Sequence, residues 1–268
     1  MKYDLFISDF DGTLGELPAN IDEETVEAIK KYTKKGGKFA IVSGRHFESI
    51  KEICSRYQIK GIVATYQGAE IRDVSTGETL YRGGLDYRLS AKIVKRLQED
   101  GCMPSVYLKD TLYYTEYSPY IAFHESSPIK IEQVKDLVEL VLEKGEPVLK
   151  ICGVSERAYL KVAEYSKDYP DVIVNSGVKW LIEVINPKDS KGGAVKFICN
   201  YYNIPFDRTI AVGDSSNDIM LLKGDWHGVA VGDADEQLKA VAKEITVPYA
   251  QKPVKILLEK YCLKEKEN

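Results

Sequence analysis

Two carboxylates, Asp9 and Asp11, follow the apolar run Leu5-Phe6-Ile7 and precede Gly12. On an extended chain, residues two apart point to the same side, so both side chains can converge just beyond the end of a strand. Two like charges held that close repel each other unless a cation lies between them or one carboxyl keeps its proton. The pair therefore indicates metal-assisted or acid–base chemistry, although an Asx turn that closes a strand uses the same Asp-Gly step.

Polar residues also follow two later apolar segments. Ser43-Gly44-Arg45 comes after the run at 39–42, and a polar segment at 213–218 comes after the run at 209–212. Lys191 opens a segment whose apolar residues recur at helical spacing. Carboxylates, a hydroxyl, a lysine, an arginine and an amide together suit Mg²⁺ and a phosphate group.

The elements that must position these residues alternate between buried strands and amphipathic helices, which predicts a doubly wound parallel sheet. Between them, short strands bracket the turns at 75–77 and 109–111, which predicts an antiparallel α+β region. We therefore predict an α/β protein with a core of residues 1–69 and 186–268 and an inserted α+β domain of residues 70–185. Because ligands bind beyond the carboxyl ends of parallel strands, the polar segments should meet in one crevice.

These segments resemble the four motifs of the haloacid dehalogenase (HAD) superfamily of phosphohydrolases. The motifs read Asp9-Phe10-Asp11-Gly12-Thr13, Ser43-Gly44-Arg45, Lys191-Gly192 and Gly213-Asp214-x-x-Asn217-Asp218. The insertion between the second and third motifs resembles the type-two cap of the Cof-like subfamily IIB. The resemblance covers essentially the whole chain, and it implies a Rossmann-like core with a cap that sets substrate specificity.

The resemblance also implies a role for each motif residue. Asp9 would be the nucleophile that forms an aspartyl-phosphate, and Asp11 would be the general acid and then the general base. Mg²⁺ would be held by Asp9, by the backbone carbonyl of Asp11 and by Asp214. Asp218 and Arg45 would lie behind these groups and orient them without taking part in the reaction directly. The phosphate-binding residues would be Phe10, Thr13, Ser43, Gly44, Lys191 and Asn217.

The predicted function is that of a Mg²⁺-dependent phosphatase for small phosphorylated metabolites, of the sugar phosphate, flavin mononucleotide or pyridoxal phosphate class. Asp11 favours phosphate-ester chemistry over dehalogenation, because a dehalogenase needs no acid for an oxygen leaving group. Two alternatives stay open: a hexose phosphomutase, which a bisphosphate would stimulate, and a regulator that binds a phosphorylated ligand without turnover.

Composition limits the partners and the compartment. Lys and Arg number 37 against 41 Asp and Glu, so the net charge of −4 indicates neither a nucleic-acid surface nor an anionic-membrane surface. The five scattered cysteines predict reduced thiols, and the first strand leaves no room for a signal peptide, so we expect a cytoplasmic protein. We expect a monomer or a weak dimer whose partner is a small-molecule phosphate ester.

Several residues outside the motifs are open in role. Gln67 and Asp233 stand where the subfamily often has Asn, so contacts near the site can differ there. His46 is interpreted as structural, and the sequence gives His124 and His227 no obvious partners. The cap tyrosines are interpreted as half core and half surface rather than an aromatic lid. Hinges are expected near 68–84 and 184–190. Candidate cap or hinge residues that reach substrate are Lys150, Asn175, Ser176, Glu183 and Asn186.

Overall fold

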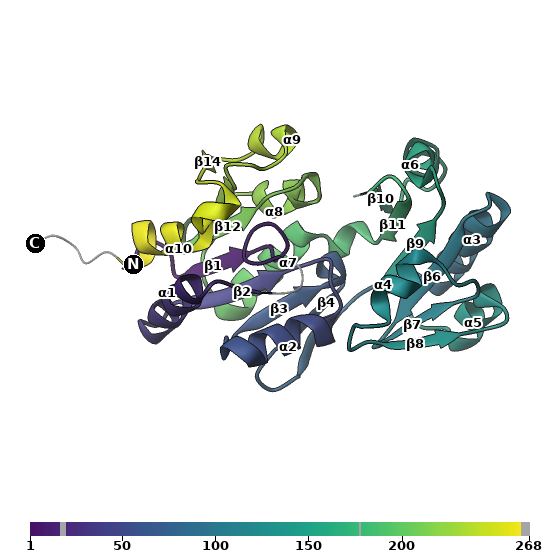
Figure 1. Cartoon of the computed structure of the whole chain (residues 1–268), viewed down its shortest axis with the longest axis horizontal. Coiled ribbons are helices and arrows are strands. Elements are labelled where there is room, and N and C mark those ends of the chain that lie inside the picture. The colour runs from purple at the N-terminus through teal and green to yellow at the C-terminus, as the bar shows by residue number, and fades with distance from the viewer. Residues whose placement is uncertain (17–19, 177, 264–268) are drawn as a thin grey trace, which may run out of the picture. The chain divides into compact units, whose positions relative to one another are not determined.

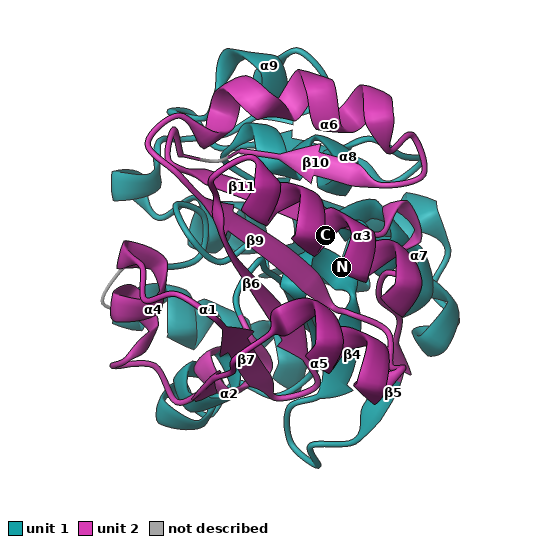
Figure 2. Ribbon diagram, turned by 90° about the vertical axis from the view of Figure 1, so that its right-hand side faces the viewer, with its two compact units in different colours: residues 1–45, 50–80, 190–268 teal, residues 46–49, 81–189 magenta. Residues whose placement is uncertain are grey.

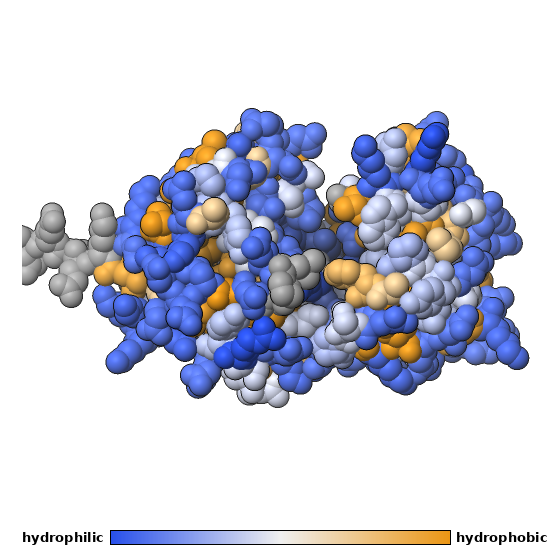
Figure 3. All heavy atoms as spheres, viewed as in Figure 1, coloured by the Kyte–Doolittle hydropathy of each residue, from blue (hydrophilic) through white to orange (hydrophobic). Residues whose placement is uncertain are grey.

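The computed structural model describes residues 1–16, 20–176 and 178–263 (Figure 1). The chain divides into two compact units, coloured separately in Figure 2. Unit 1 contains Met1–Arg45, Ile50–Leu80 and Ser190–Asn268, and unit 2 contains His46–Ser49 and Tyr81–Asp189. Hydrophilic residues predominate on the face in view in Figure 3. None of the described helices has the length and apolar character needed to cross a membrane.

Unit 1 is built on a sheet that, over the described residues, has eight strands in the order β14-β13-β12-β1-β2-β3-β4-β5. Neighbours from β14 to β3 run parallel, whereas β4 pairs antiparallel with β3. All residues of β1, β3 and β12 are buried, which explains their continuous apolar sequences. The strands are β1 (Leu5–Ser8), β2 (Lys38–Val42), β3 (Ile62–Thr65), β4 (Glu70–Asp73), β5 (Thr79–Arg82), β12 (Thr209–Gly213), β13 (His227–Ala230) and β14 (Glu244–Ile245).

The strand order reverses between β1 and β12. From β1 the chain proceeds to β2 and β3 on one side, and after the insertion it returns to β12 on the other side. Ser8 pairs with Val212 in this register, and the N–H of Asp9 donates to the Val212 carbonyl at 2.9 Å. In doubly wound sheets, ligands bind beyond the carboxyl ends of the strands at such a reversal. The predicted fold class is confirmed, and its switch point lies where the first and fourth motifs begin.

Helices connect these strands, and polar caps fix where two of them begin. The Asp22 carboxylate accepts the Thr25 N–H at 3.0 Å before α1, and the Ser190 hydroxyl accepts the Gly193 N–H at 3.3 Å before α7. The helices are α1 (Glu23–Lys34), α2 (Phe47–Tyr57), α7 (Lys191–Tyr202), α8 (Ile219–Leu222), α9 (Glu236–Lys239) and α10 (Pro253–Leu258). Shorter 3₁₀ turns are η1 (Tyr66–Gly68), η3 (Pro187–Asp189), η4 (Phe206–Arg208), η5 (Ser216–Asp218) and η6 (Tyr249–Gln251), and η7 (Glu259–Leu263) is a π-helical turn.

Unit 2 contains a second sheet, whose described strands follow the order β10-β11-β9-β6-β7-β8. Pairing is antiparallel except between β7 and β8. Helices α3 and α5 lie side by side against the sheet and enclose an apolar core (Figure 2). The elements are β6 (Met103–Leu108), β7 (Thr111–Tyr114), β8 (Lys130–Gln133), β9 (Lys150–Val154), β10 (Ile173–Asn175), β11 (Leu181–Ile185), α3 (Tyr87–Glu99), α4 (Pro119–His124), α5 (Leu137–Lys144), η2 (Ala158–Lys161) and α6 (Val162–Asp168).

The boundaries between the units differ from those predicted. The structure divides the chain at 80/81 and 189/190 and also places His46–Ser49 in unit 2, whereas the sequence predicts divisions at 69/70 and 185/186. The first division differs because β4 and β5 extend the sheet of unit 1 beyond β3, although their hairpin pattern resembles that of the insertion. All five cysteines are free and buried, in agreement with the interpretation as reduced thiols.

Candidate active site

The loop after β1 brings its backbone against Asp214. Gly12 has a φ of +75°, and a Cβ at this position would lie 2.5 Å from Oδ2 of Asp214. Only glycine tolerates both the left-handed backbone and this approach. The Phe10 carbonyl accepts the N–H groups of residues 13–15, and the Thr13 hydroxyl donates to Oδ1 of Asp214 at 3.1 Å. The short loop therefore connects the first motif to the fourth.

Lys191 is the central cation of this group. Its Nζ donates to Oδ1 of Asp9 at 2.8 Å, to Oδ1 of Asp218 at 2.6 Å and to Oδ1 of Asn217 at 3.0 Å. The Lys191 side chain is 2% exposed. A lysine in the first turn of a helix faces the positive end of the helix dipole, so the carboxylates must compensate it. Burial lowers the pKa of Lys191, but the charges of Asp218 and Asp9 outweigh burial and raise it, which keeps the ammonium charged.

Asp218 is held by the turn that follows β12. Its Oδ2 accepts the N–H groups of Asp214 at 3.1 Å and of Ser215 at 3.3 Å, while Oδ1 faces Lys191. A Cβ at Gly213 would lie 2.7 Å from the side chain of Asp218, so glycine permits this close turn. The Asp218 side chain is fully buried and thereby orients Lys191.

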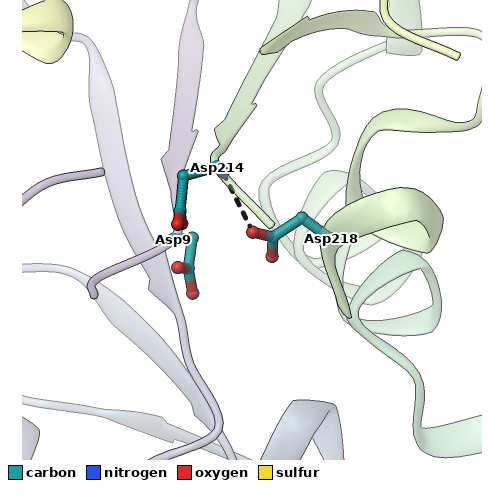
Figure 4. Close-up of side chains that lie close together, drawn as sticks. All are labelled: Asp9, Asp214 and Asp218. Atoms are coloured by element: carbon teal, nitrogen blue, oxygen red, sulfur yellow. Dashed lines mark hydrogen bonds between the residues drawn. The ribbon is translucent and has the colours of Figure 1, made fainter. Parts of the chain in front are cut away.

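Three carboxylates converge here. Asp9, Asp214 and Asp218 each offer an oxygen within 4.8 Å of the others (Figure 4). Burial, and then the charge of Asp218, raise the pKa of Asp214 to about 6. Burial is also the largest cause that raises the pKa of Asp9, followed by the Asp218 charge. Because Lys191 contributes a single positive charge, the group keeps an excess of negative charge and fits a bound divalent cation with oxygen ligands.

The second motif lies at the end of the neighbouring strand β2. The Ser43 N–H donates to the Ala64 carbonyl at 2.8 Å, and the buried Ser43 hydroxyl accepts the Arg45 N–H at 3.2 Å. A Cβ at Gly44 would lie 2.7 Å from Nε2 of Gln67, and the backbone N–H of Gln67 donates to the Ser43 carbonyl at 3.0 Å. Gln67 thus packs directly against the second motif from η1.

The sequence did not predict that Gln67 lies against the second motif. It is 5% exposed and has a φ of +63°, a backbone region uncommon for a side chain of its size. Its departure from the subfamily pattern was visible in the sequence, but its contact with Gly44 was not. Such strained backbone is typical of sites where the surroundings fix a side chain.

Asp11 and Arg45 form a separate pair. The Asp11 carboxylate is not among the three clustered carboxylates; it accepts two hydrogen bonds from the Arg45 guanidinium. The guanidinium lies 4.8 Å from the centroid of the buried Phe10 ring. The predicted site residues therefore fall into three groups: one around Lys191, one formed by Asp11 with Arg45 and Phe10, and one formed by Ser43 with Gly44.

The candidate residues in unit 2 have partners within that unit. Lys150 forms an ion pair with Glu183 at 2.8 Å, the Asn186 amide donates to the Gly84 carbonyl, and the Ser176 hydroxyl donates to the Val178 carbonyl. Tyr107 and Tyr120 are buried, whereas Tyr117 is exposed. Asn175 pairs with Glu183 across β10 and β11.

Comparison with known proteins identifies the class to which this fold and site belong. A family model described as haloacid dehalogenase-like hydrolase matches residues 6–257, so the chain belongs to the haloacid dehalogenase-like hydrolase family. Phosphatase YwpJ of Bacillus subtilis is 25% identical over 91% of this chain and 94% of its own length.

Two solved structures share the fold. A haloacid dehalogenase-like hydrolase from B. subtilis has a TM-score of 0.83 and 24% identity, and covers 96% of this chain and 99% of its own. The HAD subclass IIB sugar phosphatase BT4131 has a TM-score of 0.81 and 20% identity, over 96% of this chain and 98% of its own. The predicted family resemblance is confirmed, and so is the prediction of an enzyme of the phosphoric monoester hydrolase class.

Proposed function

We propose that the chain is a Mg²⁺-dependent phosphatase that hydrolyses small phosphorylated metabolites through an aspartyl-phosphate intermediate. The observation that carries the proposal is the group around Lys191, where a buried lysine contacts Asp9 and Asp218 while Asp214 completes an excess of carboxylates. A phosphate ester needs such an ammonium for its oxygens and a carboxylate free to attack phosphorus.

The chain's own residues account for both half-reactions. An Asp9 oxygen attacks phosphorus as the bond from phosphorus to the leaving oxygen breaks, and Asp11 gives that oxygen a proton. In the second half-reaction Asp11 takes a proton from water, whose oxygen attacks phosphorus and releases Asp9 with inorganic phosphate. Lys191 faces Asp9 and would hold a phosphoryl oxygen throughout, and the Ser43 hydroxyl and the Gly44 N–H would hold the others.

The carboxylates would also hold the metal. Asp9, the Asp11 carbonyl and Asp214 are the groups that we assign to Mg²⁺, and Asp218, held by the backbone of its turn, would orient Lys191 beside them. When bound, Mg²⁺ neutralises the repulsion between Asp9 and the phosphate and withdraws charge from phosphorus. The Thr13 hydroxyl orients Asp214 for this purpose.

We further propose that unit 2 is a cap that selects the substrate. Its insertion between the second and third motifs supports this assignment. Both chain segments that lead into and out of unit 2 meet at Asp189, whose buried carboxylate accepts the Tyr81 hydroxyl at 2.5 Å and the Gly84 N–H at 2.6 Å. This cross-link supports hinges immediately outside residues 81–84 and 186–189.

The test measures phosphate release from p-nitrophenyl phosphate and from a panel of sugar phosphates, flavin mononucleotide and pyridoxal phosphate, with Mg²⁺ and with EDTA. We expect turnover by the wild type that requires Mg²⁺ and that Asp9→Asn abolishes. Asp4→Asn is the matched control, since Asp4 pairs with Arg208 at the other end of β1. The absence of release from every ester by the wild type would contradict the proposal.

A further inference from the structure

The Asp11 carboxylate is held by a forked ion pair. Nε of Arg45 donates to Oδ2 of Asp11 at 2.8 Å, and a terminal guanidinium nitrogen donates to Oδ1 at 2.6 Å. Both carboxylate oxygens are therefore engaged by one planar group. Forked arginine pairs of this kind fix the orientation of the carboxylate as well as its position.

Arg45 itself is fixed in three places. Its guanidinium carbon lies over the ring of Phe10, a fully buried residue that separates Asp9 from Asp11 in the chain. Its backbone N–H donates to the Ser43 hydroxyl, and its backbone carbonyl accepts the Tyr66 backbone N–H at 3.0 Å. The Arg45 side chain is 18% exposed, compared with 49% for Asp11. The arginine is thus the anchored member of the pair, and Asp11 is the member that it holds.

Another fork of the same geometry lies in unit 1, at the opposite ends of the strands. Arg208 donates to Asp4 from Nε at 2.8 Å and from a terminal nitrogen at 2.6 Å. Asp4 precedes β1 and Arg208 precedes β12, so this pair lies at the amino ends of the two strands, away from the carboxyl ends that carry the motifs. Removal of this pair is therefore a matched control, because it removes a forked ion pair and leaves the motif residues unchanged.

We propose that Arg45 is the positioning residue for Asp11, and that it fixes the carboxyl group where it gives a proton to poor leaving groups. The inference rests on the proposed function, because it assigns to Arg45 the support of the acid in that reaction. Asp11 is half exposed, and without the fork it would exchange among rotamers in water. A misplaced acid matters only when the leaving oxygen needs a proton as its bond to phosphorus breaks.

The proton balance explains why the effect depends on the leaving group. In the acid form of Asp11, the oxygen that carries the hydrogen gives up its hydrogen bond from Arg45. The other bond can stay in place and keep the carboxyl oriented. A nitrophenolate leaves as an anion and needs no proton, whereas a phenolate without the nitro group leaves less readily and gains from the acid.

The experiment compares kcat/KM for p-nitrophenyl, phenyl and p-methoxyphenyl phosphate with Mg²⁺. These esters are similar in shape, and kcat/KM reports only the steps up to formation of the aspartyl-phosphate. For Arg45→Met we expect a loss of roughly 10- to 100-fold with phenyl phosphate and less than about threefold with p-nitrophenyl phosphate. Arg45→Lys keeps the charge without the fork and should recover part of the loss.

A double-variant comparison identifies the route of the effect. If Arg45 acts through Asp11, Arg45→Met in an Asp11→Asn background leaves the ratio between the two esters unchanged. Arg208→Met removes the matched fork and should leave the wild-type ratio intact. It also serves as the folding control, because both variants lose the same kind of ion pair.

Two results would overturn the inference. Equal losses with all three esters would show that Arg45 contacts the phosphate or only stabilises the fold, and the proposed function would still stand. An added loss in the Asp11→Asn background would likewise show a direct contact between Arg45 and the substrate. If the wild type releases no phosphate from any of the three esters, the proposed function fails and this inference fails with it.

Discussion

Lys191 in unit 1 and Lys150 in unit 2 are both buried lysines that contact a carboxylate, but their surroundings differ in charge. Lys191 lies among Asp9, Asp214 and Asp218, and it contacts two of them. Lys150 forms an ion pair with Glu183 at 2.8 Å, and its ammonium lies 5.2 Å from the centroid of the Tyr107 ring. The first group has an excess of negative charge, and the second pair is balanced.

The groups next to Lys150 form a hydrogen-bonded chain of neutral side chains. The Cys152 thiol donates to the Tyr120 hydroxyl at 3.3 Å, that hydroxyl lies 2.6 Å from the Tyr107 hydroxyl, and the latter lies 3.0 Å from Nε2 of His124. Nδ1 of His124 lies 2.8 Å from the Tyr120 carbonyl and donates to it. Every donor then has one acceptor if the His124 ring is neutral.

The difference shows what marks a reactive site. The ion pair between Lys150 and Glu183 has no net charge, and the hydrogen-bonded side chains beside it satisfy one another. The pair therefore stabilises the packing of β9 against β11 without a further ion. Surplus carboxylates around one lysine are stable only when a further cation or a proton joins them. We therefore expect chemistry at Lys191 and a structural role at Lys150.

The largest expected effect comes from removal of each lysine. Lys191→Met should lower kcat/KM by roughly 10²- to 10³-fold, because the phosphoryl oxygens lose their ammonium. It should also destabilise the fold by about 3–5 kcal/mol, since buried carboxylates lose their partner. Lys150→Met should destabilise the fold by a similar amount of about 3–5 kcal/mol and leave kcat/KM per folded molecule within about threefold of wild type.

Denaturant unfolding and initial rates measure the two effects separately. Lys150→Met combined with Glu183→Leu should recover most of the lost stability, because it removes the uncompensated charge as well. A loss of kcat/KM in Lys150→Met as large as that in Lys191→Met would place Lys150 in the site and end the contrast between the two lysines.

The next effect is a pH dependence of opposite sign in the two units. Burial lowers the pKa of His124 to about 4, from an ordinary value of 6.5. Between these values the unfolded chain holds a proton that the folded protein does not. The contribution of neutral His124 to the free energy of unfolding is therefore complete above pH 6.5. It is lost as the pH falls towards 4, by about 3 kcal/mol.

Asp214 should act in the opposite direction when no metal is bound. Its pKa of about 6 lies above the ordinary value of 3.8, so the folded protein holds a proton that the unfolded chain releases. Its contribution is complete below pH 3.8 and is lost as the pH rises through 6, again by about 3 kcal/mol. Urea unfolding in EDTA across this pH range measures both effects. Compared with the wild type, His124→Asn should lose less stability as the pH falls, and Asp214→Asn should lose less stability as the pH rises.

Much of the fold was readable from the sequence because its strands are unusually uniform. The runs at 5–8, 39–42 and 209–212 are buried on both faces, and only a parallel sheet covered on both sides requires that. The sequence pattern predicts that the hairpin of β4 and β5 belongs to the insertion, because an antiparallel edge of a parallel sheet has the same alternation and turn residues as an antiparallel domain. Local pattern does not tell which sheet a hairpin joins.

The candidate site was readable in its residues and less so in its contacts. Topology alone brings three of the residues together. Asp9 and Asp214 each follow a strand of one sheet, and Lys191 begins α7, the helix that precedes the second of these strands. The distinction between the clustered Asp218 and the separate Asp11 depends on side-chain direction, which spacing does not encode. The contact between Gln67 and Gly44 depends on a positive φ at a residue that rarely adopts it.

The smallest effect that distinguishes the two lysine environments is stabilisation by metal. A ligand that binds only the folded state stabilises it by about 2.7 kcal/mol when its concentration is 100 times the dissociation constant. The surplus carboxylates around Lys191 should therefore give the EDTA-treated protein a higher unfolding temperature on addition of Mg²⁺. Asp214→Asn removes one of them and should abolish this rise, whereas Glu183→Gln alters a balanced pair and should retain it. Thermal unfolding of the three proteins with increasing Mg²⁺ measures the difference, and an equal rise in all three would mean that the metal binds elsewhere than at the clustered carboxylates.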